Sequence, residues 1–143
     1  MPSYTGTVQS PRPASEVFPY MADFSNTKDW DPNITETAVT SAGSPIQIGA
    51  TFHVVQGSGL TKVELDYETI ELTDGHKVVL RAETDSLVSI DTITVDAEET
   101  GSKVTYDVNI ELKGARKLAE PVMAVMLHRI GKEAREGLQK QLS

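Results

Sequence analysis

The feature that most constrains the fold of this chain is a run of six strand-like segments followed by one long amphipathic helix. The clearest segment alternates apolar Val104, Tyr106 and Val108 with polar Thr105 and Asp107, which is typical of a strand with one buried and one solvated face. The connections between segments are too short for the crossovers that parallel strands need, so antiparallel pairing is expected. The predicted strands are Ile34–Thr40, Thr51–Gln56, Thr61–Leu72, Lys77–Thr84, Leu87–Glu98 and Lys103–Lys113.

Ahead of these segments, the sequence predicts one more strand and two short helices. Residues Tyr4–Ser10 form the strand, which ends at Pro11 because proline has no N–H to donate to a sheet. Apolar residues recur at helical spacing from Ala14 onward, and a second short helix is expected over Asp23–Asp29. The expected order is therefore strand, two helices, six strands and one helix.

After the last strand, the sequence predicts a helix over about Leu118–Gln141. Its apolar residues recur every four positions, and the expected buried stripe is Leu118, Val122, Met126, Ile130, Ala134 and Leu138. An antiparallel sheet with one apolar face is expected to bury that face against this helix. Because a seven-stranded sheet twists and curls, the helix need not fill the concave face, and the remaining space would form a ligand pocket.

The composition excludes several classes of protein. The 143 residues contain no cysteine, which excludes a disulfide scaffold and a thiolate metal site. The net charge of −8 argues against nucleic acid and anionic membrane as main partners. The three histidines share no ligand spacing, so no metal and no cofactor is expected. One domain over 1–143, without a signal peptide or membrane-spanning segment and located in the cytoplasm, is the expectation.

Several short runs, taken in order, resemble one known family. They are Val17–Phe24, Asp29–Pro32, Ile48–Phe52, Val79–Arg81, Asp91–Val95 and Gly101–Tyr106. Their order and spacing are similar to the polyketide cyclase/dehydrase branch of the START-like (SRPBCC) superfamily, over nearly the whole chain. The resemblance implies an α+β helix-grip fold, in which a seven-stranded antiparallel sheet curls around the C-terminal helix and encloses a hydrophobic cavity. It also implies binding of lipids, polyketides or other apolar molecules, but it does not imply a particular reaction.

The apolar candidates for lining such a cavity lie near the tryptophan and on the last helix. Trp30 offers a large rigid wall, although it would equally serve to pack the short helix onto the sheet. Met123, Met126, Leu127 and Ile130 occupy the wide apolar part of the helix. Methionine adapts to varied ligand shapes, but a stripe of this kind is more often ordinary core.

Three polar residues are candidates for contacting a ligand from the strands. Tyr67 shares the parity of Leu65 and is expected to point inward. Asp91 shares the parity of Ile93, but an unpaired buried carboxylate is costly, so an outward position is favoured. The direction of His53 is open, and an exposed histidine is favoured because no carboxylate adjoins it in the sequence.

These patterns predict a protein that binds one hydrophobic small molecule, as a monomer or weak homodimer, without stable membrane insertion. The alternative is an enzyme, a polyketide cyclase/dehydrase that uses Tyr67, His53 or Asp91 to move protons. A buried Asp91 or His53 that touches the cavity and has a shifted pKa would favour the enzyme. In a third hypothesis the helix fills the sheet completely, and the domain is an interaction module with an exposed apolar patch.

Overall fold

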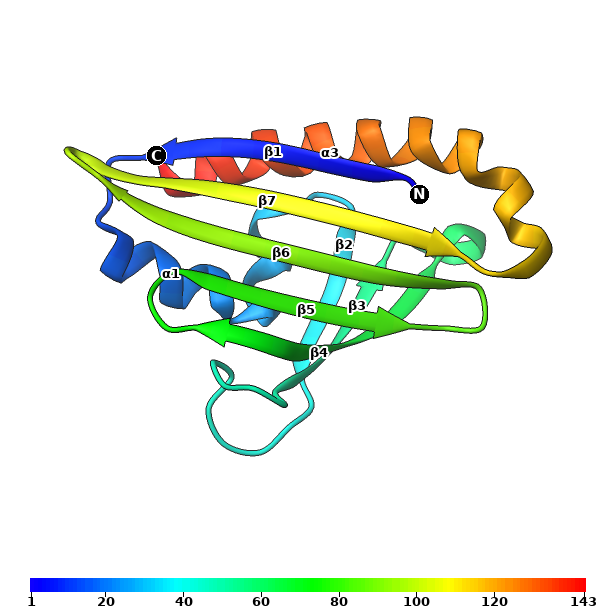
Figure 1. Cartoon of the computed structure of the whole chain (residues 1–143), viewed down its shortest axis with the longest axis horizontal. Helices are drawn as coiled ribbons and strands as arrows, with labels where there is room; N and C mark the ends of the chain where they lie inside the picture. The colour runs from blue at the N-terminus through cyan, green and yellow to red at the C-terminus, as the bar shows by residue number, and fades with distance from the viewer.

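Seven strands form one antiparallel sheet that curls around a long C-terminal helix in the computed structural model, which describes residues 1–143 (Figure 1). The strand order is β1-β7-β6-β5-β4-β3-β2, so the first strand pairs with the last and forms one edge of the sheet. This is the α+β helix-grip architecture that the sequence predicted. The strands are β1 Ser3–Ser10, β2 Ile34–Val39, β3 Thr51–Gln56, β4 Val63–Thr73, β5 Lys77–Glu83, β6 Leu87–Glu98 and β7 Gly101–Leu112.

The helices follow the predicted order, with two local differences. The second short helix, predicted over Asp23–Asp29, is divided into a 3₁₀ turn and one α-helical turn, and Asp23 caps the first by accepting a hydrogen bond from the backbone N of Ser25 at 3.1 Å. The predicted strand start at Thr61 lies in another 3₁₀ turn, so β4 begins two residues later. The helical elements are α1 Ala14–Ala22, η1 Phe24–Asn26, α2 Thr27–Trp30, η2 Gly59–Thr61, η3 Gly114–Ala119 and α3 Glu120–Leu142.

The hydrophobic core lies where α1 and the C-terminal half of α3 meet the concave face of the sheet. Phe18 from α1, Phe52 from β3, Leu80 from β5, Ile93 from β6 and Leu138 from α3 are each at most 2% exposed. Residues of this size, when fully buried, each contribute roughly 1.5–3 kcal/mol relative to exposed positions. This end of the molecule is therefore closed and well packed.

The N-terminal half of α3 is packed differently from the prediction. Leu118 and Val122, which were expected in the buried stripe, are 88% and 62% exposed. Leu118 lies in η3, outside α3. Within α3, a strict four-residue spacing drifts by about 40° per step around a helix of 3.6 residues per turn, so Val122 lies far around the helix from Leu138. The buried residues of α3 are Leu127, Gly131, Ala134, Leu138 and Leu142, so the predicted stripe is correct at Ala134 and Leu138 and wrong at Val122 and Met126.

Two glycines let the C-terminal half of α3 approach its neighbours closely. A Cβ atom on Gly137 would lie 1.9 Å from the carbonyl oxygen of Trp30, and one on Gly131 would lie 2.4 Å from the ring of Tyr4. Glycine is unfavourable inside a helix by about 1 kcal/mol relative to alanine, so packing rather than helix propensity explains these positions. The close contact with Trp30 holds α2 against α3.

Candidate functional site

A cavity of about 370 Å³ lies between the concave face of the sheet and α3. This volume falls in the range of roughly 300–1,000 Å³ that is usual for small-molecule sites. Of the 30 residues that line it, 19 are hydrophobic. The hypothesis that the helix fills the sheet completely is therefore wrong.

The cavity opens to solvent between the start of β4 and the N-terminal half of α3. Val63 on β4 and Met126 on α3 both line the cavity, yet they are 42% and 44% exposed. Gly57 and Thr61, from the connection that precedes β4, also line it. A ligand would enter on this side, because the opposite end is closed by the core.

All five apolar candidates, Trp30, Met123, Met126, Leu127 and Ile130, line the cavity. Trp30 is only 4% exposed, and its ring meets that of Tyr106 edge to face with the centroids 5.4 Å apart. Trp30 therefore belongs to the core and also forms part of the cavity wall, so both roles expected from the sequence apply. The α3 residues are graded from buried Leu127 through half-buried Met123 and Ile130 to exposed Met126.

Four hydrogen-bonded side chains interrupt the apolar wall on the sheet side, and together they form what we call the polar patch. The Ser89 hydroxyl donates to Oδ1 of Asp91 at 3.0 Å, and the Tyr106 hydroxyl donates to Oδ2 of the same carboxylate. The Tyr67 hydroxyl is hydrogen-bonded to the Ser89 hydroxyl at 3.1 Å. All four residues line the cavity, so the polar patch is accessible to a ligand inside it.

The outward position that was favoured for Asp91 is wrong. Its side chain faces the cavity and is only 3% exposed. The register of β6 with β7 runs unbroken from Leu87 to Glu98, so the parity of Ile93 extends to Asp91 without a bulge. The two donated hydrogen bonds offset part of the cost of burying the carboxylate, which the sequence argument had assigned to an unpaired group.

Burial raises the pKa of Asp91 to about 6, although hydrogen bonds from Tyr106 and Ser89 act in the opposite direction. Burial also raises the pKa of Tyr67 and Tyr106 well above the usual value, and the Asp91 charge adds to this effect. The two tyrosines are therefore neutral donors over the whole physiological pH range. Asp91 is the group of the polar patch that titrates near neutrality.

A second buried carboxylate lines the cavity at the end of α2. Asp31 is 8% exposed and accepts a hydrogen bond from the backbone N of Asn33 at 2.9 Å. Burial raises its pKa to about 6, while the hydrogen bond from the Asn33 backbone acts in the opposite direction. Neither Asp31 nor Asp91 forms an ion pair within the chain.

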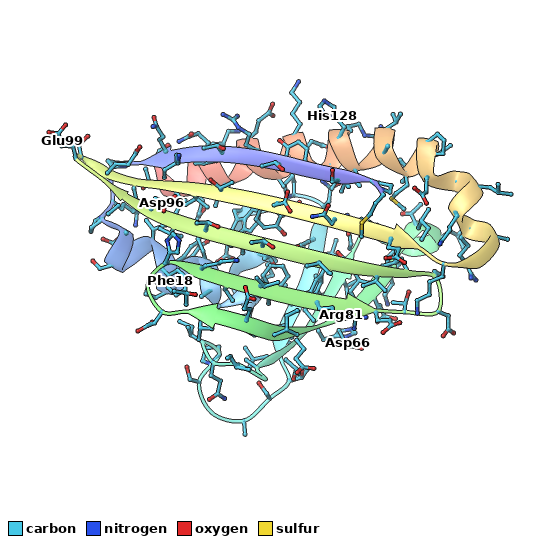
Figure 2. The ribbon with its side chains drawn as sticks, in the orientation of Figure 1. Phe18, Asp66, Arg81, Asp96, Glu99 and His128 are labelled. Atoms are coloured by element: carbon cyan, nitrogen blue, oxygen red, sulfur yellow. The ribbon has the colours of Figure 1, made fainter.

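The structure places His53 on the outer face of the sheet, so its inclusion among the ligand-contacting candidates is corrected. Its Nδ1 lies 2.8 Å from Oδ1 of Asp66, and its Nε2 lies 3.3 Å from Oε1 of Glu64. The hydrogen bond with Asp66 is the largest of the effects that raise the pKa of His53. Figure 2 shows Asp66 among the side chains at the outer surface of the sheet.

Asp31, Ser89 and Tyr106 line the cavity with polar groups that were not predicted from the sequence. Ser89 and Tyr106 share the parity of inward-facing neighbours on their own strands, so the alternation contained the signal for both. Pairing of Ile93 with Tyr106 and of Asp91 with Val108 then brings the two strands into contact around Asp91. Asp31 lies outside any strand, and no periodicity pointed to it.

None of the helices combines the length and hydropathy needed to cross a membrane. A search among curated proteins finds no match. Solved structures with the same fold include a START superfamily protein from Mycobacterium smegmatis (TM-score 0.79, 10% identity, covering 98% of this chain and 96% of that one). The ZhuI aromatase/cyclase from Streptomyces sp. R1128 gives a TM-score of 0.79 at 10% identity, covering 98% and 92% of the two chains. The major latex-like protein 151 of Panax ginseng gives 0.68 at 10% identity, covering 98% and 96%.

At these identities the structural likeness establishes the helix-grip fold and nothing finer. The sequence itself matches a family model along its whole length, over residues 1–143. That family is described as polyketide cyclase/dehydrase and lipid transport. The chain belongs to this family.

Proposed function

We propose that this protein binds one apolar or amphipathic small molecule, lipid-like or polyketide-like, in the cavity between the sheet and α3. The observation that carries the proposal is the enclosed volume of about 370 Å³ with a mainly hydrophobic lining. Affinity would come from burial of apolar ligand surface, at roughly 25 cal/mol per Å² before the costs of association. Trp30, Tyr67, Met123, Met126, Leu127, Ile130 and Asp91 are the residues that we expect to contact the ligand.

The direct test is native mass spectrometry of freshly purified protein, followed by solvent extraction and identification of any molecule that travels with it. Binding is then measured with an uncharged fluorescent probe, N-phenyl-1-naphthylamine, and its displacement by apolar compounds. A homogeneous apo mass together with no binding of the probe or of any lipid tested would contradict the proposal.

A residue-level test uses two neighbouring positions on α3. Met123 lines the cavity, whereas Val125 is 72% exposed and does not line it. We expect Met123→Trp to lower probe affinity at least about tenfold by filling cavity space, and Val125→Trp to change it less than about twofold. Equal effects of the two substitutions would show that the cavity is not where the probe binds.

A second candidate function is enzymatic, and one observation favours it. Asp91 is buried, touches the cavity and has a pKa of about 6, which was the condition stated for a cyclase/dehydrase. A carboxylate with a pKa near the working pH can remove a proton from an activated carbon, and the resulting carboxylic acid can return that proton to a carbonyl oxygen. His53 is not available for this role, because it lies on the outer face.

The two functions are separated by following a carbonyl-rich model substrate by mass spectrometry. Cyclisation followed by dehydration would appear as loss of one water, whereas simple binding leaves the mass unchanged. We expect Asp91→Asn to abolish any such conversion if the enzymatic function is correct. Retention of conversion in that variant would exclude Asp91 as the base.

We also predict that residues 1–143 form one domain, which is a monomer or weak homodimer in solution. The protein is expected to be cytoplasmic, to bind no nucleic acid and not to insert stably into membranes. Light scattering at increasing concentration tests the oligomeric state. Cell fractionation of the tagged protein tests the location. A stable higher oligomer or a membrane-bound fraction would contradict the respective prediction.

A further inference from the structure

Counting the hydroxyl hydrogens of the polar patch shows which group donates and which accepts in each of its hydrogen bonds. Ser89 has one hydroxyl hydrogen, and it is donated to Oδ1 of Asp91. The hydrogen bond between Tyr67 and Ser89 must therefore be donated by Tyr67. The hydrogen of Tyr106 is donated to the other carboxylate oxygen.

All three hydroxyl hydrogens of the polar patch are thus used inside it when Asp91 is ionised. What remains toward the cavity is a set of lone pairs on the two tyrosine oxygens, on the serine oxygen and on the carboxylate. Groups of this kind accept hydrogen bonds and donate none. A ligand group that also only accepts would find no donor in the polar patch, and burying a group unpaired there costs more than a good pair gains.

No cation reverses this arrangement. Apart from two arginines, the titratable groups that line the cavity around Asp91 are Tyr4, Asp31, Tyr67 and Tyr106, and none of them is positive. Arg129 and Arg135 on α3 also line the cavity, but both are exposed and neither pairs with Asp91. Nε of Arg135 donates instead to the backbone oxygen of Thr7 at 3.0 Å.

We propose that the polar patch selects ligands with a hydrogen-bond-donating head group, an alcohol, phenol or ammonium, over ligands whose polar group is a ketone, ester or carboxylate. This inference rests on the proposed function, that the cavity binds an apolar molecule. The ligand class is thus defined by its head group rather than by its apolar part. The apolar part supplies most of the affinity, and the polar patch discriminates between head groups.

The test compares decyl compounds that differ in the head group. Displacement of N-phenyl-1-naphthylamine is measured at pH 7.5 with decan-1-ol, decylamine, decan-2-one and decanoate. We expect decan-1-ol and decylamine to displace the probe at concentrations about tenfold or more below those of decan-2-one, with decanoate weakest. Physiological salt is used, so that attraction of decylamine to the acidic surface is screened.

Two variants on the same strand identify the source of this preference. Asp91→Asn keeps the size of the side chain but supplies a donor, so the preference for alcohol over ketone is expected to fall below about threefold. Asp96→Asn is the matched control, because Asp96 is on the outer side of β6 (Figure 2), where it lies 3.3 Å from His76. This control should keep the wild-type preference, and circular dichroism checks that both variants fold.

The pH dependence gives an independent readout. Near pH 5 a protonated Asp91 becomes a donor, so the alcohol-to-ketone preference of the wild type is expected to shrink, as the pKa of about 6 implies. Asp31 titrates in the same range, so the comparison is made against Asp91→Asn, in which only Asp31 remains. A preference that is unchanged in that variant and at pH 5 would overturn the inference.

The remaining outcomes are also decisive. Equal displacement by all four compounds, or stronger displacement by the ketone or carboxylate, overturns the head-group inference while the proposed binding function stands. Failure of the probe and of every decyl compound to bind overturns the proposed function, and this inference with it.

Discussion

The two halves of α3 both carry aliphatic side chains, but these side chains have opposite surroundings. In the C-terminal half, Leu138 and Leu142 are 1% and 3% exposed and pack into the core. In the N-terminal half, Val122 and Val125 are 62% and 72% exposed. The C-terminal half is therefore mainly packed core, although Ala134 and Leu138 also touch the cavity, and the N-terminal half is mainly cavity wall or solvent surface.

The difference shows that stability and ligand access are assigned to different parts of one element. The packed half is held by close contacts, including Gly137 against the backbone of Trp30. The open half contributes Met123 and Met126 to the cavity without filling it. A substitution in the packed half is thus expected to change stability, and one in the open half to change binding.

The largest expected effect comes from removing a packed side chain. Leu138→Ala is expected to lower the free energy of unfolding by about 2–5 kcal/mol, because it leaves a cavity in a fully buried site. The matched substitution in the open half, Val122→Ala, is expected to change it by less than about 0.5 kcal/mol. Urea denaturation followed by circular dichroism measures both, and similar losses would contradict the division of α3 into two halves.

The next effect concerns the cavity wall and depends on pH. The pKa of Asp91 rises from 3.8 to about 6 on folding, so between these values the folded state binds more protons than the unfolded state. Ionised Asp91 therefore lowers the free energy of unfolding as pH rises through this window, by about 3 kcal/mol in total. Asp91→Asn does not titrate, so its stability relative to the wild type should improve by about that amount between pH 4 and pH 7.

Denaturation curves of both proteins at several pH values measure this difference. Loss of the carboxylate as an acceptor changes the free energy of unfolding of the variant by the same amount at every pH. Only the pH dependence of the difference between the two proteins therefore reports on the pKa of Asp91. Asp31 is present in both proteins and largely cancels. A difference that does not vary with pH would mean that Asp91 keeps an ordinary pKa.

The smallest of the three effects tests the close contact between Gly137 on α3 and Trp30 on α2. Gly137→Ala should gain about 1 kcal/mol in helix propensity, yet its Cβ would lie 1.9 Å from the Trp30 carbonyl oxygen. We expect the clash to prevail, with a net loss of about 1–3 kcal/mol. Lys132→Ala, at an exposed position of the same helix, is the control and should be nearly neutral. A stabilised Gly137→Ala variant would show that α3 can move away from α2 at no cost.

Alternation and turn residues were sufficient to predict the sheet. Asp74-Gly75, between the segments that form β4 and β5, favours a tight turn because these residues accept a positive φ. In the structure Gly75 has a φ of +77°, and the N–H of His76 donates to the carbonyl of Thr73 at 3.0 Å. The stripe on α3 was predicted correctly in its C-terminal part, where Ala134 and Leu138 are buried, and wrongly at Val122 and Met126, which are exposed. A strict four-residue spacing drifts by about 40° per step around an α-helix, so it does not stay on one side over the length of α3.

The candidate site could be predicted only where one strand held the information. Tyr67 points inward as its parity indicated, whereas the position of Asp91 depends on hydroxyls from two other residues. Ser89 lies two residues before Asp91 on β6, but Tyr106 lies on β7, so only strand pairing shows that the carboxylate has two donors. The same limit applies to His53, whose carboxylate neighbours are supplied by pairing of β3 with β4.

The unbroken register of β6 has a consequence for how this protein can diverge. Its twelve residues encode two surfaces in alternate positions, so Ser89 and Asp91 can be exchanged for other inward residues while Ile90 and Thr92 stay as they are. A deletion of a single residue early in the strand would instead turn the carboxylate outward and bring an aliphatic side chain inward. Single substitutions at inward positions can therefore change the lining of the cavity gradually, whereas a one-residue change in strand length would replace the polar side chains in one step.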